Sequence, residues 1–379
     1  MFSFYIVCVF LLDWGLAVRR VVMAGWELPY VFEYGGLGVY GRCLVDAFVR
    51  RGFSVTWFGC VPEGGGSLEP VRVNDMFTAV PVAFVFDLGE RDIARIRSAV
   101  VAGVLNAVRY GRVDALITHD HHMVTAALVG MGHGIPTVHS VHTITGDIVE
   151  GGVMCGVGKV VTNSIIMRDA LISIISTMMP AVEPRPSPPD VRVIHPAVPD
   201  FPRSVREDDV KAFRRAVKYA DVVIGVLGRE QWNKNYGVVV EAVRRMREEG
   251  INAALLMSGV GLEKYVTDEW VVHVGRVPEE KKAAFYKALD VFVLPSTFEP
   301  FGMVALEAAS LGVPTVVSRN AGVTEVLKSA PTFSPDDPDQ LVKVIKDVIG
   351  TDIGDKLREE SMRRTWDDVA EEYINALGL

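Results

Sequence analysis

The sequence predicts two α/β domains, each built on a doubly wound parallel sheet. The 379 residues suit two or three domains at roughly 150 residues each. Short β-branched runs alternate with longer helical patterns, which is typical of parallel sheets covered by helices on both faces. The alternation stops at a proline-rich stretch, Pro180 to Pro202, and then starts again. We therefore expect domains at residues 18–203 and 204–364, followed by a last helix at 365–379.

Composition and charge exclude several classes of protein. Hydrophobic residues make up 49% of the chain and charged residues 23%, which indicates globular cores rather than disorder. The formal net charge is −8, whereas proteins that bind nucleic acid usually carry a basic surplus, so no nucleic-acid partner is expected. The four cysteines form no C-x-x-C pair, which favours reduced thiols in a cytoplasmic protein. They are Cys8, Cys43, Cys60 and Cys155.

The chain starts with an apolar run, Phe2 to Leu12, that is shorter than the about 20 residues needed to span a bilayer. Arg19 and Arg20 follow the run, whereas a signal peptide has its basic residues in front. Residues 1–17 are therefore predicted to be an extension outside the fold, with a membrane-associating N-terminus as the alternative. An integral membrane span is not expected.

The first domain is expected to begin with a strand, a glycine turn and a helix. The helix covers Val39 to Arg51, because its apolar residues recur on one face and Gly52 follows it. Strands are expected at Arg20 to Trp26, Phe53 to Phe58, Ala115 to Thr118 and Thr137 to Val141, with a helix near Met123 to Met131. Since proline lacks an N–H donor, the proline-rich stretch is expected to be a loop with one short strand, Val191 to Ile194.

The second domain repeats the alternation. Its strands are expected at Val222 to Leu227, Ala253 to Ser258, Val271 to Val274, Val291 to Leu294 and Thr315 to Val317. Its helices are expected at Tyr236 to Glu249, Glu279 to Leu289 and Met303 to Leu311, before a helical C-terminal region. Open α/β sheets bind ligands beyond the carboxyl ends of their strands, so residues that directly follow strands are the candidate site residues.

A glycine loop, Gly35-Gly36-Leu37-Gly38, lies between the first strand and the first helix. Glycines let a ligand approach bare backbone, and the helix offers N–H groups at its positive end. Phosphate binding is one interpretation and a tight turn is the other. In the second domain Gly228 and Arg229 follow a strand, and Lys234 comes five residues after Arg229. Two such cations suit a diphosphate, although solvated surface cations are the alternative.

The most specific segment follows the strand Val291 to Leu294. Glu299-Pro300-Phe301-Gly302 forces a loop, and an apolar helix starts behind it at Met303. Glu307 lies in the first turns of that helix, where a buried carboxylate requires hydrogen-bond donors. Glu307 could accept hydrogen bonds from two ribose hydroxyls, and Glu299 is expected to face a ligand. A charged loop with a capping glutamate is the alternative.

Five histidines follow two predicted strands of the first domain, with Asp120 among them. They are His119, His121, His122, His139 and His142. A metal site is the less favoured interpretation, because Asp120 points away from His119 on an extended segment and no further spaced ligand completes a site. Hydrogen bonding to a polyhydroxylated substrate fits better, since imidazole offers both a donor and an acceptor.

Together these segments resemble the retaining glycosyltransferases with two Rossmann-like domains, the GT-B fold, and in particular the glycogen synthase and glycosyltransferase family 4 group. The resemblance covers nearly all of the chain from Arg20 onward. Glu299 to Glu307 is similar to that group's E-x7-E block, and Gly228-Arg229 with Lys234 resembles its G-R-x4-K element. Glu27-Leu28-Pro29 with the glycine loop looks like its N-terminal loop. Trp366 to Tyr373 resembles the C-terminal helix that crosses back to the first domain.

The resemblance implies two domains that face each other across a cleft, and it implies a role for each site residue. Arg229 and Lys234 would hold the donor's diphosphate, and Glu307 would bind the ribose. Glu299 would bind the transferred sugar, with the amides of Gly302 and Met303 contacting sugar or phosphate. Gly36 and Leu37 would close over the phosphates, and Gly35 is a further substrate-binding candidate. His142 would contact the sugar, and His119 is a further substrate-binding candidate.

The expected activity is a retaining hexosyltransferase that moves a sugar, glucose above all, from a nucleotide-diphosphate sugar to a glucan or another carbohydrate acceptor. The resemblance implies no metal and no other cofactor. Glu33 and Tyr34 precede the glycine pair where glycogen synthases commonly have lysine, which favours a broader family 4 enzyme acting on glycoconjugates or small sugars. Two further alternatives are a different enzyme on the same fold, such as a sugar-nucleotide epimerase or a phosphorylase, and a non-catalytic nucleotide- or glucan-binding protein. The sequence does not indicate an oligomeric state.

Overall fold

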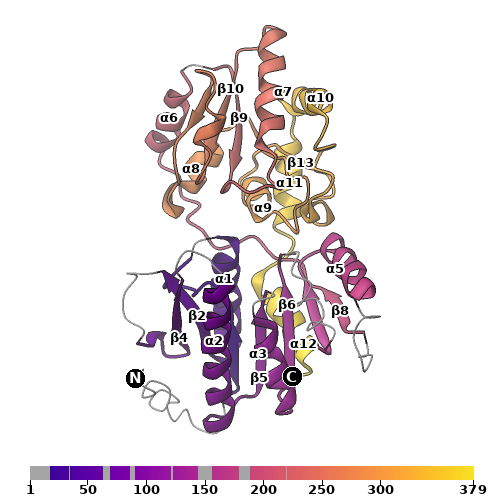
Figure 1. The fold of residues 1–379 in the computed structure, drawn as a ribbon. Coiled ribbons are helices and arrows are strands. Elements are labelled where there is room, and N and C mark those ends of the chain that lie inside the picture. The colour runs from indigo at the N-terminus through magenta and orange to yellow at the C-terminus, as the bar shows by residue number, and fades with distance from the viewer. Residues whose placement is uncertain are drawn as a thin grey trace. The chain divides into compact units, whose positions relative to one another are not determined.

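The computed structural model describes residues 18–33, 35–62, 69–85, 90–120, 123–143, 156–178, 188–218 and 220–379. The chain divides into two compact units, each with its own sheet (Figure 1). Unit 1 is Met1–Pro196 with Trp366–Leu379, and unit 2 is Ala197–Thr365. The predictions for residues 1–17, Tyr34, His121, His122 and Cys155 lie outside the described residues.

Unit 1 contains a sheet with the strand order β3-β4-β2-β1-β5-β6-β7-β8, in which only β3 is antiparallel to its neighbour among the described strands. The strands are β1 (Arg20–Ala24), β2 (Ser54–Pro62), β3 (Val71–Asn74), β4 (Phe77–Val85), β5 (Ala115–His119), β6 (Thr137–Val141), β7 (Lys159–Thr162) and β8 (Asp190–Val193). The helices are α1 (Gly36–Arg50), α2 (Glu90–Tyr110), α3 (Val124–Gly132), α5 (Ile165–Met178) and α12 (Trp366–Leu377).

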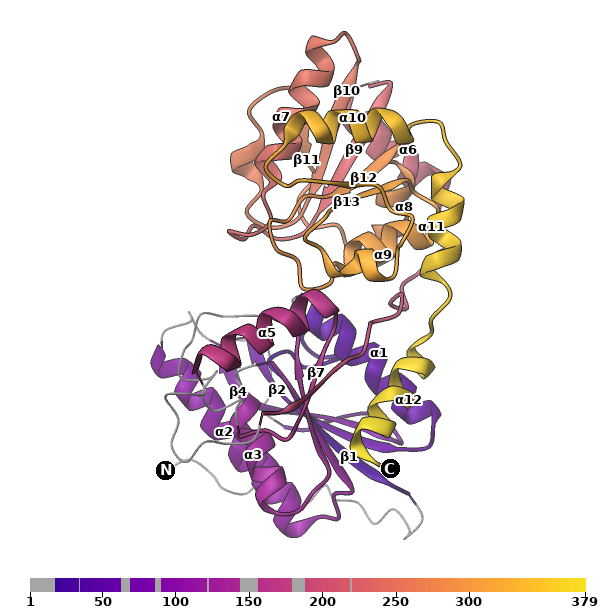
Figure 2. The same ribbon diagram turned by 90° about the vertical axis from the view of Figure 1, so that its right-hand side faces the viewer.

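Alternate residues of the strands supply a core on each face of this sheet. Val22 and Phe58 pack with residues of α2 and α3 on one face. Trp57, which neighbours Phe58, points to the other face and lies against Gly41 of α1. The last helix of the chain, α12, packs beside α1 and against β6 (Figure 2). The residues around β6 are therefore covered by a segment from the far end of the sequence.

Unit 2 contains an all-parallel sheet with the order β11-β10-β9-β12-β13-β14. Its strands are β9 (Val222–Leu227), β10 (Ala253–Ser258), β11 (Val271–His273), β12 (Val291–Leu294), β13 (Thr315–Ser318) and β14 (Thr332–Phe333). Its helices are α6 (Glu207–Ala216), α7 (Tyr236–Glu248), α8 (Lys282–Lys287), α9 (Met303–Ser310), α10 (Pro338–Val348) and α11 (Ile353–Ser361). The helices α7 and α10 cover one face, and α8, α9 and α11 cover the other.

The border between the units lies a few residues before the predicted one. Residues 197–203 were assigned to the first domain, but Val198 and Phe201 pack into the core of unit 2. The strand β8 pairs with β7 at the edge of the unit 1 sheet. The C-terminal segment 366–379 packs within unit 1. Among the described residues, no helix is both long enough and apolar enough to cross a bilayer.

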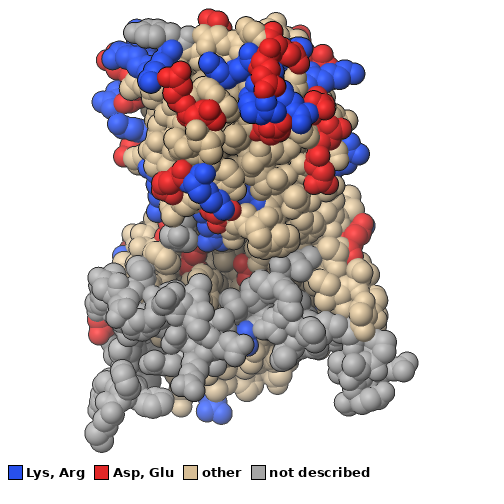
Figure 3. Space-filling model, turned by 45° about the horizontal axis from the view of Figure 1, so that its top comes forward, with Lys and Arg blue, Asp and Glu red and all other residues tan. Residues whose placement is uncertain are grey.

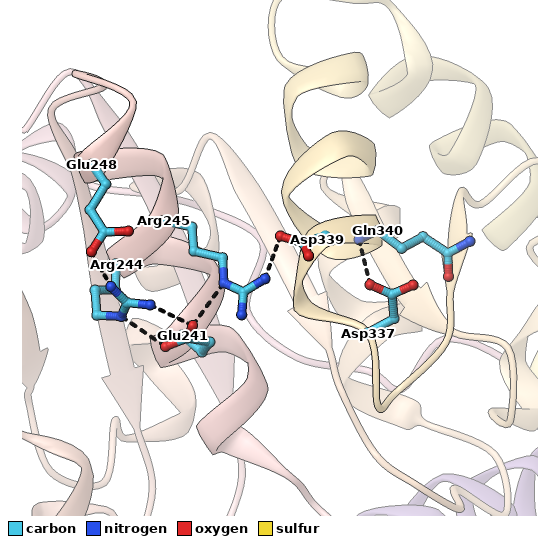
Figure 4. Close-up of polar contacts among 7 residues, drawn as sticks. All are labelled: Glu241, Arg244, Arg245, Glu248, Asp337, Asp339 and Gln340. Carbon is cyan, nitrogen blue, oxygen red and sulfur yellow. Dashed lines mark hydrogen bonds and ion pairs between the residues drawn. The ribbon is translucent and has the colours of Figure 1, made fainter.

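The surface of unit 2 is charged and mixed in sign. Lys and Arg lie interspersed with Asp and Glu on the face in Figure 3. One ion-pair group links α7 to α10 (Figure 4): Glu241 pairs with Arg244 at 2.6 Å and with Arg245 at 2.7 Å, and Arg245 also reaches Asp339 of α10. The two arginine hydrogen bonds lower the pKa of Glu241 to about 2. Such exposed pairs add little stability, so the apolar contacts between the two helices dominate.

Close packing of α11 on the loop after α9 gives a test of this architecture. A Cβ on Gly354 would lie 2.2 Å from the carbonyl oxygen of Gly312, whereas a Cβ on Gly237 would meet nothing within 4 Å. Both glycines are the second residue of a helix. We expect Gly354→Ala to lower the free energy of unfolding by about 1–3 kcal/mol through overpacking. The matched Gly237→Ala should leave it unchanged or raise it by up to about 1 kcal/mol. Denaturant unfolding of both variants measures this, and equal effects would contradict the packing.

Candidate active site

The loops that follow β9 and β12 meet through an ion pair between two predicted site residues. Lys234 Nζ lies 2.7 Å from Glu299 Oε2, and both side chains are largely buried. Ser296 Oγ donates a second hydrogen bond of 2.8 Å to the same carboxylate oxygen. Lys234, which is expected to bind a diphosphate, is thus neutralised by Glu299, which is expected to bind a sugar. A ligand that binds Lys234 through an anionic oxygen has to share this lysine with Glu299.

Backbone contacts hold these two loops in place. The Asn233 side chain donates to the carbonyl of Phe298 at 2.8 Å, and the Thr297 amide donates to the carbonyl of Asn233 at 2.8 Å. Asn320 donates from its side chain to the carbonyl of Thr297 at 2.9 Å. Sequence reasoning missed Asn233 and Asn320, although asparagines next to loop residues of this kind are typical partners for loop carbonyls. Their contacts fix the backbone on both sides of the Lys234–Glu299 pair.

The other predicted cation, Arg229, comes two residues after the end of β9, and its side chain is exposed. Gly228 before it has φ 150°, and a Cβ there would lie 2.7 Å from the Tyr236 hydroxyl. Glycine is therefore required at this turn. The loop is tied to the loop after β10 by the hydrogen bond from the Glu230 amide to the Val260 carbonyl, at 2.8 Å.

Glu307 lies on α9 in a buried ionic cluster, with 2% of its surface exposed. Tyr286 donates to its Oε2 at 2.7 Å, and Lys282 lies 3.2 Å from its Oε1. Burial lowers the pKa of Lys282, but the charges of Glu307 and Glu279 outweigh burial and raise that pKa above its ordinary value. Burial, together with the charge of Glu307, raises the pKa of Tyr286 well above its ordinary value, so the phenol keeps its proton. The donors that a buried carboxylate requires come from Lys282 and Tyr286 of the predicted helix α8, and these two residues were not named from the sequence as partners of Glu307.

The turn before α9 has the geometry predicted for it. Gly302 has φ 105°, and a Cβ there would lie 2.6 Å from the Leu294 side chain, so no larger residue fits without strain. The helix starts at Met303. The Ala305 amide donates to the Gly302 carbonyl at 3.0 Å, whereas the amides of Met303 and Val304 have no partner inside the helix. Those amides at the positive end of the helix are suited to a ligand oxygen.

In unit 1, the predicted phosphate loop is already occupied by a carboxylate of the chain. Glu27 Oε2 accepts hydrogen bonds from the amides of Gly35 at 3.0 Å and Gly38 at 2.9 Å. A Cβ on Gly38 would lie 2.4 Å from this oxygen, which explains the glycine. The amide of Gly35 is therefore engaged, whereas those of Gly36 and Leu37 have no partner among the described residues. Gly36 is exposed and Leu37 half-buried. A phosphate at this loop would lie beside the charge of Glu27.

Glu33, an acidic residue close to the glycine loop, is neutralised by an arginine of α1. Its Oε1 lies 3.1 Å from the Arg42 guanidinium and accepts from the Tyr30 amide at 3.0 Å. The pair removes the negative charge that the sequence placed next to the glycine loop.

Two of the predicted histidines are brought together. His119 Nδ1 lies 3.0 Å from His142 Nε2, and the His119 ring stacks on Trp57 at a centroid distance of 4.9 Å. Burial lowers the pKa of His119 well below its ordinary value, and nearby His142 and His139 lower it further. Burial also lowers the pKa of His142, against an opposing effect of the Asp120 charge. Both imidazoles are therefore neutral at pH 7.

The remaining residues of this set have supporting positions. His139 Nδ1 bonds to Thr118 Oγ1 at 2.8 Å rather than to His119 or His142. Asp120 has φ 60°, and its Oδ1 accepts from the amides of His142 at 2.8 Å and Thr143 at 3.1 Å. Asp120 thus fixes the backbone at His142. In the described part of the chain, no three His, Cys, Asp or Glu side chains are grouped as metal ligands would be.

The buried pair on α8 and α9 leads to a stability prediction. Lys282→Met leaves the Glu307 carboxylate buried without its cation, which should lower the free energy of unfolding by about 3–5 kcal/mol. The double variant Lys282→Met with Glu307→Gln should recover most of this loss, because no unpaired charge remains. Denaturant unfolding compares the two. A double variant as unstable as the single one would show that the ion pair is not the cause.

The contact between Glu27 and the glycine loop leads to a second stability prediction. Glu27→Ala removes the acceptor from two amides at the start of α1 and should lower the free energy of unfolding by about 2 kcal/mol. Glu33→Ala is the matched control, since Glu33 accepts from one backbone amide rather than two, that of Tyr30, which lies outside α1, so we expect a smaller loss of about 1 kcal/mol. Equal losses in denaturant unfolding would argue against a capping role of Glu27.

Known protein families match both units. The family described as Glycosyltransferase Family 4 matches residues 34–200, and the family Glycosyl transferases group 1 matches residues 209–364. A glycogen synthase of Mycobacterium tuberculosis is 25% identical over 91% of this chain and 89% of its own. A D-inositol 3-phosphate glycosyltransferase of Paenarthrobacter aurescens is 25% identical over 81% of both chains.

A solved structure with the same fold is the catalytic domain of starch synthase IV from Arabidopsis thaliana, bound to ADP and acarbose. Its TM-score is 0.72 at 15% identity, and the match covers 96% of this chain and 99% of that chain. At this identity the likeness concerns the fold. Two parallel-sheet units, each matched by a glycosyltransferase family, identify the protein as a member of the glycosyltransferases with the GT-B fold.

Proposed function

We propose that this glycosyltransferase is a retaining hexosyltransferase that moves glucose from a nucleotide-diphosphate glucose to a hydroxyl of a carbohydrate acceptor. The observation that carries the proposal is the largely buried pair of Lys234 and Glu299 at the carboxyl ends of β9 and β12. This pair places a cation suited to a leaving diphosphate next to a carboxylate suited to sugar hydroxyls.

In the proposed reaction Lys234 and Arg229 hold the diphosphate. Bond breaking at the anomeric carbon leaves negative charge on the departing phosphate, and fixed cations stabilise that charge. Lys234 is held by Glu299 at 2.7 Å and is therefore oriented before the donor binds. In this proposal the leaving phosphate takes the acceptor's proton, so the step requires neither a covalent nucleophile nor a metal.

The carboxylates and His142 bind hydroxyl groups in this scheme. Glu299 keeps its second oxygen, Oε1, for the transferred sugar, since Lys234 and Ser296 both contact Oε2. Glu307 would use the lone pairs that Lys282 and Tyr286 leave to accept from the ribose. His142, neutral through burial, would contact the sugar with its remaining ring nitrogen.

The acceptor is proposed to be a glucan, with glycoconjugates, small sugars and sugar phosphates as alternatives. One relative is named as a glycogen synthase and another as a D-inositol 3-phosphate glycosyltransferase. Cys43 and Cys60 are buried thiols outside any disulfide, which suits a reducing compartment, so we propose a cytoplasmic location.

The first experiment measures nucleotide release from four donors: ADP-glucose, UDP-glucose, UDP-N-acetylglucosamine and GDP-mannose. Each donor is incubated alone, with glycogen, and with glucose 6-phosphate or inositol 3-phosphate. Release from a glucose donor that rises with glycogen supports the glucan acceptor. If nucleotide release rises only with a phosphorylated acceptor, the protein is still a transferase, but its acceptor is a phosphorylated compound rather than a glucan. Nucleotide binding without release under every condition would indicate a non-catalytic binding protein.

Lys234→Gln tests the residue that carries the proposal. Loss of a charge that stabilises the leaving group should cost at least about 2 kcal/mol, roughly a thirtyfold fall in kcat. Lys264→Gln is the matched control, because Lys264 is an exposed lysine that pairs with Glu230 at 2.9 Å on a neighbouring loop. Steady-state kinetics with the best donor compare the two. Unchanged turnover in Lys234→Gln, with the fold intact by circular dichroism, would remove Lys234 from the site.

A further inference from the structure

A chain of hydroxyl groups connects the last helix of the protein to His142. Tyr373 of α12 lies 2.7 Å from Ser140 Oγ, and Ser140 Oγ lies 3.1 Å from His142 Nε2. On its other side the Tyr373 hydroxyl lies 2.9 Å from the Tyr40 hydroxyl of α1. All of these residues belong to unit 1. We call Tyr40, Tyr373 and Ser140 the hydroxyl relay.

The relay residues are fixed by packing. Tyr373 is fully buried, and Tyr40 and Ser140 are buried as well. The Tyr40 ring packs edge-on against His142 at a centroid distance of 4.5 Å and against Trp366 of α12 at 5.0 Å. Burial raises the pKa of Tyr373 to about 12, so its hydroxyl keeps a proton to donate at neutral pH. The relay therefore consists of three buried hydroxyls, and that of Tyr373 keeps its proton at neutral pH.

The hydrogen-bond partners of the two histidines indicate which ring nitrogen of His142 carries the proton. His142 Nε2 has two neighbours, Ser140 Oγ and His119 Nδ1. If His142 carried its proton on Nε2, His119 would have to accept at Nδ1 and carry its own proton on Nε2. That atom is buried and has no partner among the described residues. An orphaned buried N–H is costly, whereas an orphaned lone pair costs less.

In the favoured arrangement His142 Nε2 carries no proton and accepts hydrogen bonds. Tyr40 donates to Tyr373, Tyr373 donates to Ser140, and Ser140 donates to His142 Nε2, which also faces the Nδ1–H of His119. The proton of His142 then resides on Nδ1, the ring nitrogen without a partner among the described residues. In this tautomer His142 presents an N–H donor, which suits a hydroxyl oxygen of a sugar.

We propose that Tyr373 is a positioning residue that, acting through Ser140 and together with His119, fixes His142 in the Nδ1–H tautomer with its donor directed to the substrate. The inference deepens the proposed function, because it assumes that His142 contacts the sugar. The part that concerns the tautomer depends only on the contacts within unit 1.

The primary test reads the tautomer directly and requires no activity. Ring-nitrogen chemical shifts from NMR of isotope-labelled histidine distinguish Nδ1–H from Nε2–H, and the spectrum of a His142→Asn variant identifies the His142 signals among those of the eight histidines. The wild type should show protonated Nδ1 and unprotonated Nε2. Tyr373→Phe removes only the hydroxyl and should shift His142 toward a mixture of tautomers. An Nε2–H wild type, or a Tyr373→Phe spectrum identical to that of the wild type, overturns the proposal.

Kinetics of a double-mutant cycle test whether Tyr373 acts through Ser140. Tyr373→Phe and Ser140→Ala should each lower kcat roughly fivefold, the loss of one neutral hydrogen bond, with KM for the donor unchanged. The double variant should be no slower than Ser140→Ala alone, since the relay is already broken. If the fold-losses in kcat of the two single variants multiply in the double variant, the relay is contradicted, and each substitution damages the structure separately.

Tyr30→Phe is the matched control. Tyr30 also lies in unit 1 and donates its hydroxyl to Asp46 of α1, but it has no contact with the relay. It should change neither the His142 signals nor kcat, and an effect equal to that of Tyr373→Phe would count against the relay. If the wild type transfers no sugar, the proposed function fails while the NMR test still decides the tautomer.

Discussion

The ion pair between Lys234 and Glu299 is the contact on which the candidate site of unit 2 depends. It joins loops that leave two adjacent parallel strands, β9 and β12, at the same edge of the sheet. Because the pair is largely buried, removal of either partner leaves a charge in a poorly solvated place. The surrounding amide contacts from Asn233 and Asn320 keep the two loops in register, so the pair is part of a rigid arrangement rather than a surface ion pair.

Each candidate ligand group is held by the chain's own partners. Glu299 has Lys234 and Ser296, Glu307 has Lys282 and Tyr286, and the amides at the start of α1 have Glu27. Such internal partners hold charged side chains in place without a substrate. Catalytic groups held in advance lose less entropy when the substrate binds. Glu27 differs from the others, since its charge opposes the phosphate expected at that loop.

Much of the fold could be predicted because parallel sheets have a simple pattern. The expected strands at Ala115 to Thr118, Thr137 to Val141, Val222 to Leu227 and Val291 to Leu294 are confirmed within one residue. The Phe53 to Phe58 strand is longer than expected and continues to Pro62. The elements β3, β4, α2, β7 and α5 were not placed from the sequence. For α5, Ser164 just before the helix was overlooked, although its hydroxyl accepts from the Met167 amide. The unit border was missed by a few residues because proline content marks a loop but not the core in which its apolar residues pack.

The candidate site was predictable where residue type and position after a strand agree. That holds for Lys234 with Glu299 and for His119 with His142, which the structure brings together, while their roles stay predictions. Partners from distant segments were not predictable. Tyr286 does not stand out in the sequence, and Glu27 and Tyr373 were noted only as parts of motifs. Tertiary packing brings them to Glu307, the glycine loop and Ser140.

The position of α12 has a consequence for biosynthesis. Unit 1 is discontinuous, because residues 197–365 are inserted between its sheet and its last helix. During translation the whole of unit 2 is therefore made before Trp366 and Tyr373 exist, and domains generally fold as units while the chain emerges. Until α12 docks, the apolar surface of α1 and β6 that it covers stays uncovered, and the hydroxyl neighbours of His142 are incomplete. A ribosome-bound chain that stops short of Trp366 would thus hold a finished second unit and an unfinished first one.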